Sequence, residues 1–168
     1  MQISKNTPLV VTGGASGLGQ ATAEAFAKAG APVAIFDINE EKGEAVAKAI
    51  GGLFCKVNIL DEQSVLDGFE KARAAHGQER VTVHCAMTAK GGKTLRFDKE
   101  SHAFKRLPTE DYEFGAQGIL VASYRVASIS ALGMANAGFG CRDGRADRTG
   151  GLRVVQGRRE RAGAATGA

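Results

Sequence analysis

The sequence predicts an α/β fold, a doubly wound parallel sheet covered by helices. Short apolar runs alternate with segments of helical periodicity between residues 8 and 86, and parallel neighbouring strands need such helical crossovers. A glycine-rich turn joins the first apolar run to the first helical segment. Together these observations predict a Rossmann-like sheet with strand order 3-2-1-4, incomplete at its C-terminal side.

The apolar runs are predicted to be buried strands because each is short and ends at turn residues or polar residues. They are residues 8–12, 32–36, 53–57 and 81–86. Between them, apolar side chains recur at helical spacing over residues 17–29, 40–50 and 61–75. Gly30 and Gly51 are expected to end the first two helices, and Asp61 to cap the third.

The pattern changes after the fourth strand. Residues 88–108 are rich in Lys and Gly and are expected to form a polar loop. A helix is expected from Thr109 to about Asn136, although three glycines lower its helix propensity.

The composition separates a folded part from a tail. The chain is 43% hydrophobic and 24% charged, which suits one folded domain rather than a disordered chain. Of the last 32 residues, 8 are Gly, 7 are Arg and 6 are Ala, with no apolar periodicity. We therefore assign residues 1–136 to one partial domain and residues 137–168 to a Gly/Arg/Ala-rich tail without predicted regular structure.

The charge balance gives weak support for a nucleic-acid partner. Lys and Arg number 22 against 18 Asp and Glu, a net charge of +4, and the excess falls between Cys141 and Arg161. A basic balance confined to one short segment is poor evidence for a nucleic-acid-binding domain. We expect no nucleic-acid partner.

The cysteines and the apolar segments indicate the cellular compartment in which the protein is expected. Cys55, Cys85 and Cys141 lie far apart with no CxxC pair, so the sequence predicts neither a disulfide framework nor a metal site. No segment has the pattern of a signal peptide or a membrane span. We expect a cytoplasmic protein with no membrane partner.

The turn after the first strand reads TGGASGLG over residues 12–19. Glycines let the backbone turn tightly and approach a pyrophosphate, and the following helix N-terminus offers free N–H groups and the positive end of its dipole. A purely structural turn needs no such density of glycines. The motif predicts dinucleotide binding, with contacts at Gly13, Ser16, Gly17, Leu18 and Gly19.

Asp37 closes the second strand, 18 residues after Gly19. An acid at this place accepts hydrogen bonds from the adenosine ribose hydroxyls and repels a 2′-phosphate, so NAD is the expected cofactor rather than NADP. The alternative is an ordinary N-cap for the next helix, and the two roles are compatible.

The spacing Gly13-x3-Gly17-x-Gly19 resembles the TGxxxGxG pattern of the short-chain dehydrogenase/reductase family, and residues 8–86 resemble that family throughout. In the family, the end of the third strand contacts adenine through an acid and a following apolar residue. The resemblance implies these contacts at Asn58 and Ile59, where the amide of Asn58 replaces the acid.

The family's fourth strand ends in Asn-x-Ala-Gly beside the nicotinamide ribose, whereas this chain reads His84-Cys85-Ala86-Met87. The resemblance implies cofactor contacts at Cys85 and Ala86. Met87 places a bulky side chain where the family has glycine, and the family's helix Asn falls on Ile119. His84 is interpreted as a strand-end residue, with a catalytic role as the alternative.

Residues 85–107 resemble the extended substrate-side loop of type 2 3-hydroxyacyl-CoA dehydrogenases, which oxidise acyl-CoA alcohols and in some members hydroxysteroids. The resemblance implies an acyl-CoA substrate, a role in fatty acid metabolism and a family-type homo-oligomer. Five basic side chains of the loop would suit a CoA phosphate, although a solvated loop is the alternative for each: Lys90, Lys93, Lys99, Lys105 and Arg106.

The family's chemistry needs a Tyr hydroxyl as general acid/base, a Lys four residues later and a Ser that holds the substrate oxygen. Tyr112 and Tyr124 are the only tyrosines, and Ala116 and Ser128 stand four residues after them. No catalytic residue is therefore assigned. By resemblance the function is NAD-dependent oxidation of a secondary alcohol, a 3-hydroxyacyl-CoA, with impaired or absent turnover in this chain.

The tail composition suggests a shifted reading frame, because Gly, Arg and Ala share GC-rich codons. A one-base shift across residues 138–165 permits Ser at Phe139, Tyr at Leu152 and Lys at Gln156, in the family's order and spacing. We hypothesise a frameshifted, truncated end of such a dehydrogenase. The alternatives are a genuine Arg-rich tail that binds RNA or anionic surfaces, and a non-enzymatic nucleotide-binding module with a basic tail.

Overall fold

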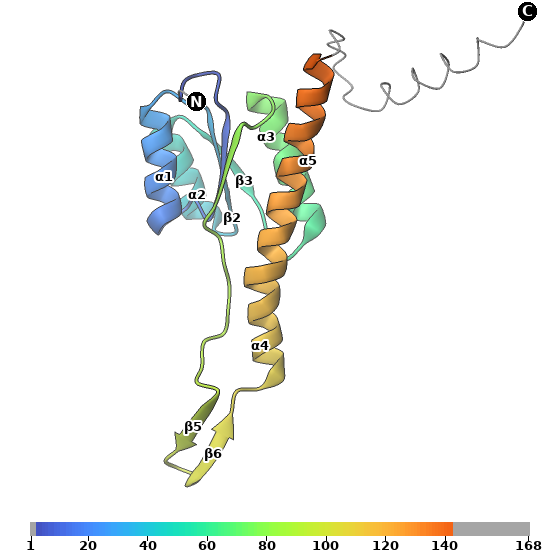
Figure 1. Cartoon of the computed structure of the whole chain (residues 1–168). Coiled ribbons are helices and arrows are strands. Elements are labelled where there is room, and N and C mark those ends of the chain that lie inside the picture. Colours follow the sequence, from blue (N-terminus) through green and yellow to red (C-terminus); the bar gives the residue numbers. More distant parts are fainter. Residues whose placement is uncertain (1–2, 143–168) are drawn as a thin grey trace, which may run out of the picture.

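The computed structural model describes residues 3–142, and their main body is a parallel sheet with helices on both faces (Figure 1). The strands are β1 (Leu9–Thr12), β2 (Val33–Asp37), β3 (Leu53–Lys56) and β4 (Val81–His84). They pair in the order β3-β2-β1-β4, and every pair is parallel. The predicted fold class and strand order are confirmed.

Three crossover helices connect these strands: α1 (Gly17–Lys28), α2 (Glu40–Ile50) and α3 (Glu62–His76). The side chain of Asp61 accepts hydrogen bonds from the N–H groups of Gln63 and Ser64, so the predicted cap of α3 is confirmed. Gly51 ends α2 with φ +66°, a left-handed conformation that glycine adopts without strain.

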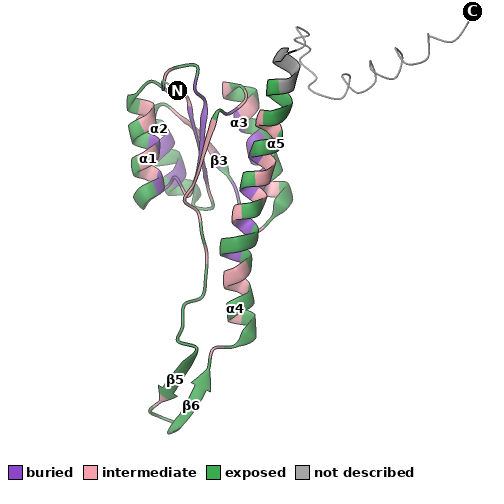
Figure 2. Cartoon of the chain, in the orientation of Figure 1, coloured by how far each residue is buried: buried purple, intermediate pink, exposed green. Residues whose placement is uncertain are grey.

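Two apolar clusters hold the sheet between its helices (Figure 2). Leu9 and Val11 of β1 face the cluster under α1 and α2, while Val10 faces the opposite cluster with Phe36 and Phe69. Alternate residues of a strand point to opposite faces, so a strand covered on both sides must be apolar throughout. This burial explains why the strands appear in the sequence as continuous apolar runs.

Residues 88–108 contain a hairpin, so the prediction of a loop there is wrong for part of the segment. β5 (Leu95–Asp98) and β6 (Ala103–Arg106) pair antiparallel at the end of an arm that projects away from the sheet (Figure 1). Phe97 and Phe104 are directly opposite, with ring centroids 5.4 Å apart. Such cross-strand aromatic pairs stabilise a hairpin, but the surrounding Lys and Gly residues hide the pattern in the sequence.

A single long helix follows the arm. It consists of α4 (Thr109–Ala116), a π-helical turn η1 (Gln117–Val121) and α5 (Ala122–Arg142). The predicted helix start at Thr109 is confirmed. The helix continues past Asn136, so residues 137–142, assigned to the tail, are helical, whereas the remaining tail residues and the hypothesised frameshift positions beyond 142 lie outside the described residues.

Within the helix from Thr109 to Gly138, an 18-residue stretch has a mean hydropathy of 1.4, so that by length and composition the helix could cross a membrane. One such helix is weak evidence, because core helices of other proteins have the same length and composition. Its inner face packs against the sheet and α3, with Ala122, Val126 and Ser130 buried. The outer face is exposed, and Leu120 and Tyr124 lie on it. The helix therefore covers part of the sheet with its inner face and leaves an apolar outer face uncovered.

Candidate functional site

A cleft of about 850 Å³ lies at the carboxyl ends of the parallel strands, the place where open α/β sheets bind their ligands. The glycine turn, the ends of β2 and β3 and the segment after β4 line it. Nine predicted cofactor contacts are brought together there: Gly13, Ser16, Leu18, Gly19, Asp37, Asn58, Ile59, Cys85 and Ala86. Gly17, the tenth, is not among the lining residues, and its φ of +55° gives it a backbone role in the turn.

The glycine turn brings three backbone segments together with no side chain between them. Gly13 has φ +70°, and a Cβ there would lie 2.7 Å from the amide nitrogen of Ala86. A Cβ on Gly19 would overlap the carbonyl oxygen of Gly13. Glycine is therefore required at both positions to join the end of β1 to α1 and to the segment after β4.

The N-terminus of α1 fits an anionic group. Ser16 is its N-cap but makes no side-chain cap hydrogen bond, and the first turn has no acidic residue. In contrast, the side chains of Asn39 and Asp61 cap α2 and α3, whose first turns are acidic. An uncapped helix N-terminus beside a cleft leaves N–H groups and a positive dipole end for a pyrophosphate.

Asp37 is held in place by the glycine turn. Its Oδ2 accepts a hydrogen bond from the N–H of Ala15 at 3.0 Å, and its Oδ1 accepts one from the N–H of Asn39 at 2.9 Å. The N-cap of α2 is Asn39, which accepts from the N–H of Lys42, so the alternative role of Asp37 as that cap is excluded. The carboxylate lines the cleft, where its remaining lone pairs suit ribose hydroxyls.

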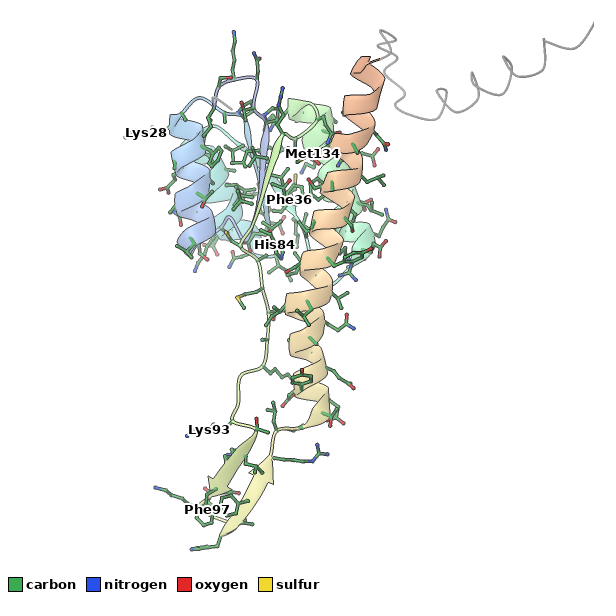
Figure 3. The ribbon with its side chains drawn as sticks, viewed as in Figure 1. Lys28, Phe36, His84, Lys93, Phe97 and Met134 are labelled. Carbon is green, nitrogen blue, oxygen red and sulfur yellow. The ribbon has the colours of Figure 1, made fainter. Side chains whose placement is uncertain are left out.

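The end of β4 is tied to β1 by side chains. The Thr12 hydroxyl hydrogen-bonds Nδ1 of His84 at 2.6 Å and accepts from the N–H of Ala86 at 3.3 Å. Figure 3 shows His84 where the chain leaves the sheet. Burial lowers the pKa of His84 below its ordinary value, since a low-dielectric setting disfavours the charged ring. His84 therefore positions the strand end, as its interpretation as a strand-end residue predicted.

Sequence reasoning missed the apolar lining of the cleft. Ile38 and Leu60 line it, as does Phe114 of α4. Ile38 is 65% exposed, so its side chain is open to the cleft that it lines. In the sequence, only its position directly after Asp37 could have indicated that Ile38 lines the cleft.

The tyrosines do not contribute to this cleft. Tyr112 and Tyr124 are 69% and 75% exposed on the long helix, and neither is a lining residue. Within the described part of the chain, no group of His, Cys, Asp and Glu side chains has the arrangement of a metal site. The cleft therefore has features that suit binding. Among the described side chains, it lacks the proton-transfer residue that the family chemistry would use.

A second hollow, of about 690 Å³, lies in the arm between the hairpin and the start of α4. Lys93, Arg96, Lys105 and Arg106 line it together with Asp111. Asp111 is paired with Lys90 at 2.8 Å, and Lys105 with Asp98. Of the five basic residues considered for a CoA phosphate, Lys93, Lys105 and Arg106 reach the hollow, while Lys90 and Lys99 are not among its lining residues.

The fold and the place of the cleft are those of the Rossmann-like class of α/β proteins. The family profile described as short chain dehydrogenase matches residues 8–111. The chain belongs to the short-chain dehydrogenase family.

Curated relatives agree with this assignment. The 3-hydroxyacyl-CoA dehydrogenase type-2 of Drosophila melanogaster is 40% identical over 129 residues, covering 76% of this chain and 49% of that protein. The Homo sapiens protein of the same name is 37% identical over 97 residues, covering 56% of this chain and 37% of that protein. The mitochondrial (-)-isopiperitenol/(-)-carveol dehydrogenase of Mentha piperita is 39% identical, covering 58% of this chain and 38% of that protein. The chain thus spans half or less of the length of these relatives.

A solved structure described as ribose-5-phosphate isomerase from Brucella melitensis 16M is also similar. Its TM-score is 0.68 at 28% identity, and the match covers 82% of this chain and 50% of that chain. The activity in that description differs from those of the curated relatives, and the likeness supports the fold alone.

Proposed function

We propose that this chain is the cofactor-binding part of an NAD-dependent dehydrogenase that oxidises a secondary alcohol, with a 3-hydroxyacyl-CoA as the substrate. The observation that carries the proposal is the cleft in which the glycine turn, the uncapped start of α1 and Asp37 meet. When bound, NAD supplies the hydride acceptor. The residues of this chain bind and orient it.

The preference for NAD over NADP follows from Asp37. Backbone N–H groups of Ala15 and Asn39 hold the carboxylate at the end of β2. A fixed negative charge at the adenosine ribose accepts hydrogen bonds from two hydroxyls, whereas it repels a 2′-phosphate. The described side chains lining the cleft include no Arg or Lys that would offset this repulsion.

The substrate part of the proposal draws on the arm. Residues 85–107 lead from the end of β4 into the hairpin (Figure 1), beside which the basic hollow lies. Lys93 and Arg96 line that hollow. Arg96 also helps to lower the pKa of the Asp98 carboxylate, which is lowered mainly by the hydrogen bond from Lys105. The basic side chains of the hollow would suit the phosphates of an acyl-CoA. The relatives named 3-hydroxyacyl-CoA dehydrogenase support the same substrate class.

The sequence contains no Tyr-x-x-x-Lys, so we propose that this chain binds NAD but turns over poorly or not at all. A general acid/base is needed to accept the alcohol proton while the hydride leaves. The proposal includes a reducing, cytoplasmic location, which fits the free thiols of Cys55 and Cys85. An oligomer of the family type is part of the same proposal.

Calorimetric titration of the full chain with NAD and with NADP tests the binding part. We expect saturable binding of NAD at one site per chain and at least tenfold weaker binding of NADP. Equal affinity for both would contradict the role of Asp37, and binding of neither would overturn the proposed function.

The catalytic part is tested by sequencing the coding DNA across residues 130–168 in all frames. A shifted open frame encoding Ser, Tyr and Lys at the predicted spacing would support the dehydrogenase. The protein expressed from that frame should then produce NADH from 3-hydroxybutyryl-CoA. A folded product without this activity would overturn the substrate class. If no such frame exists in the DNA, its absence would favour the non-enzymatic nucleotide-binding module.

A further inference from the structure

We propose that Arg125 is a positioning residue that couples the long helix to the cleft. Its side chain holds the segment 58–60, which lines the cleft after β3, in one conformation. Arg125 itself is not among the residues that line the cleft, so it acts through that segment. The inference rests on the proposed function, because its consequence is a change in the affinity for NAD.

The Arg125 side chain reaches from α5 to the backbone of a residue 66 positions earlier in the chain. Its Nη1 donates a hydrogen bond to the carbonyl oxygen of Ile59 at 2.6 Å. The side chain is only 14% exposed, and its Nε lies 3.8 Å from a carboxylate oxygen of Glu62, beyond hydrogen-bond distance. A hydrogen bond from a charged donor is strengthened where water is largely excluded. The bond to Ile59 is therefore the stronger of these two contacts.

The segment 58–60 is held from two helices. On the side of α3, the backbone N–H of Asn58 donates to Oγ of Ser64 at 3.0 Å. The side chain of Asn58 accepts from the N–H of Leu60 at 3.1 Å, which closes the turn. On the side of α5, the arginine holds the carbonyl of Ile59. All three residues of the segment line the cleft, so losing the contact to α5 frees part of the cleft wall to move.

The long helix also packs against this segment with apolar side chains. Ala122 and Val126, three positions before and one position after Arg125, are buried in the apolar cluster that contains Ile59. Figure 1 shows α5 running beside α3. The long helix, α3 and the cleft wall thus meet at one guanidinium. If the docked helix favours the conformation of the segment that binds NAD, bound NAD must in turn stabilise the docked helix.

Two variants with unbranched side chains separate the hydrogen bond from the packing. Arg125→Met keeps an apolar stem over the segment and removes the donor, whereas Arg125→Lys keeps a charged donor. The bond to Ile59 uses a single nitrogen, so a lysine can supply it, unlike a two-pronged arginine contact. Calorimetric titration of the full chain should give about tenfold weaker NAD binding in R125M, the size of one lost hydrogen bond to a charged group. R125K should bind NAD nearly as the wild type does.

Hydrogen exchange with and without NAD supplies a readout that a loss of stability alone would not move. In the wild type and R125K, NAD should slow the exchange of the helix amides around Val126, although none of these residues lines the cleft. In R125M this protection should be lost. Ser130→Ala is the matched control, because it removes hydrogen bonds of the same helix to Thr82 and Glu79, which are not cleft residues. S130A should keep both the affinity for NAD and the protection.

The outcomes separate the two proposals. Wild-type affinity and wild-type protection in R125M would overturn the role of Arg125 and leave the proposed NAD site in place. An R125K variant as weak as R125M would show that the donor is not the cause and would also overturn it. Equal weakening in S130A would assign the effect to a looser helix, with the same consequence. Failure of the folded wild type to bind NAD would overturn the proposed function and this inference with it.

Discussion

At the scale of single residues, the site depends on backbone geometry as much as on side chains. Gly13 supplies both a left-handed φ and the space in which the segment after β4 approaches the turn. Asp37 ends β2 and Asn58 lies just after β3, the neighbouring strand. The Asp37 side chain is oriented by the N–H of Ala15, and the Asn58 side chain by the N–H of Leu60. Gly13, Asp37 and His84 lead to three predictions that can be measured on single variants.

Gly13→Ala should destabilise the chain more than Gly51→Ala. Both positions have a left-handed φ, near +70° and +66°, which costs a side-chain-bearing residue about 1–2 kcal/mol. Only at Gly13 would the added Cβ also meet backbone atoms, whereas Gly51 faces open space. Urea unfolding of the two variants checks this, and equal losses of unfolding free energy would show that the close approach at Gly13 is unimportant.

Asp37→Ala should weaken NAD binding by about tenfold to a hundredfold, the effect of losing hydrogen bonds to a charged acceptor. The affinity for NADP should stay the same or rise, because the charge that repels the 2′-phosphate is gone. Titration with both dinucleotides measures the two effects. Glu41→Gln, an exposed acid in the first turn of α2, should leave both affinities unchanged, and equal weakening toward NAD and NADP in D37A would argue against a ribose contact.

His84 predicts a fall in stability at acid pH. Burial lowers the pKa of His84 below the ordinary 6.5, so below that pH the unfolded chain binds a proton that the folded chain excludes. The free energy of unfolding should therefore decrease as pH falls through 6.5 and should be insensitive to this group well above it.

Urea unfolding between about pH 8 and pH 5 tests this sign. His84→Asn should make the free energy of unfolding fall less steeply with decreasing pH, and at the alkaline end the free energy of unfolding should remain insensitive to pH. His76, whose pKa burial also lowers, supplies a remaining part of the slope. His102→Asn, at an exposed position in the hairpin, is the matched control and should behave as the wild type. A steeper acid loss in H84N would reverse the assigned direction.

At the scale of elements, a buried ion pair fastens the long helix to the body. Glu79, only 2% exposed, accepts hydrogen bonds from Arg73 of α3 at 2.9 and 2.7 Å and from Ser130 of α5 at 3.1 Å. Ser130 in turn hydrogen-bonds Thr82 of β4 at 2.7 Å. One carboxylate therefore joins α3 and α5 beside the edge strand.

Glu79→Ala should lower the free energy of unfolding by about 3 kcal/mol, because it leaves the Arg73 guanidinium without its partner in a mostly buried place. Chemical unfolding measures the loss. Glu40→Ala, which removes the exposed ion pair with Lys56, should have little effect, since exposed pairs contribute little to stability. Similar losses in both variants would mean that the buried position of Glu79 does not matter.

At the scale of the whole molecule, the edge of β4 and the outer face of the long helix are two of the uncovered surfaces among the described residues. The outer edge of β4 pairs with no described strand, and Leu120, Tyr124 and Leu132 are 69%, 75% and 64% exposed along the long helix. Unpaired edges and contiguous apolar surface favour association with other chains. The chain is expected to be only marginally stable as a monomer.

We therefore predict self-association that rises with protein concentration in sedimentation velocity. The double variant Leu120→Glu and Tyr124→Glu should shift the distribution toward monomer, because it places charges one helical turn apart on the exposed face. Leu95→Glu, at an exposed apolar position in the hairpin arm, should not. A wild type that stays monomeric at every concentration would contradict the prediction.

Much of the architecture could be predicted from local sequence patterns. The four strands, the three crossover helices, the end of α2 at Gly51 and the Asp61 cap of α3 follow from apolar periodicity, glycine and capping residues, each of which acts over a few neighbouring positions. A parallel sheet brings its carboxyl ends to one edge, so the glycine turn, Asp37 and Asn58 had to meet. The physical cause is that, along residues 8–86, the local preference for strand or helix agrees with the burial of both faces of the sheet.

Tertiary structure alone decided the features that depend on distant partners. The hairpin needs Phe97 opposite Phe104 across a turn, and the Thr12 hydroxyl finds His84 72 residues away. Asn39 replaces Asp37 as the cap because the Asp37 carboxylate bonds the N–H of Ala15. Pairwise contacts between remote segments have no local pattern, since the energy that fixes them appears only when the fold brings both partners together.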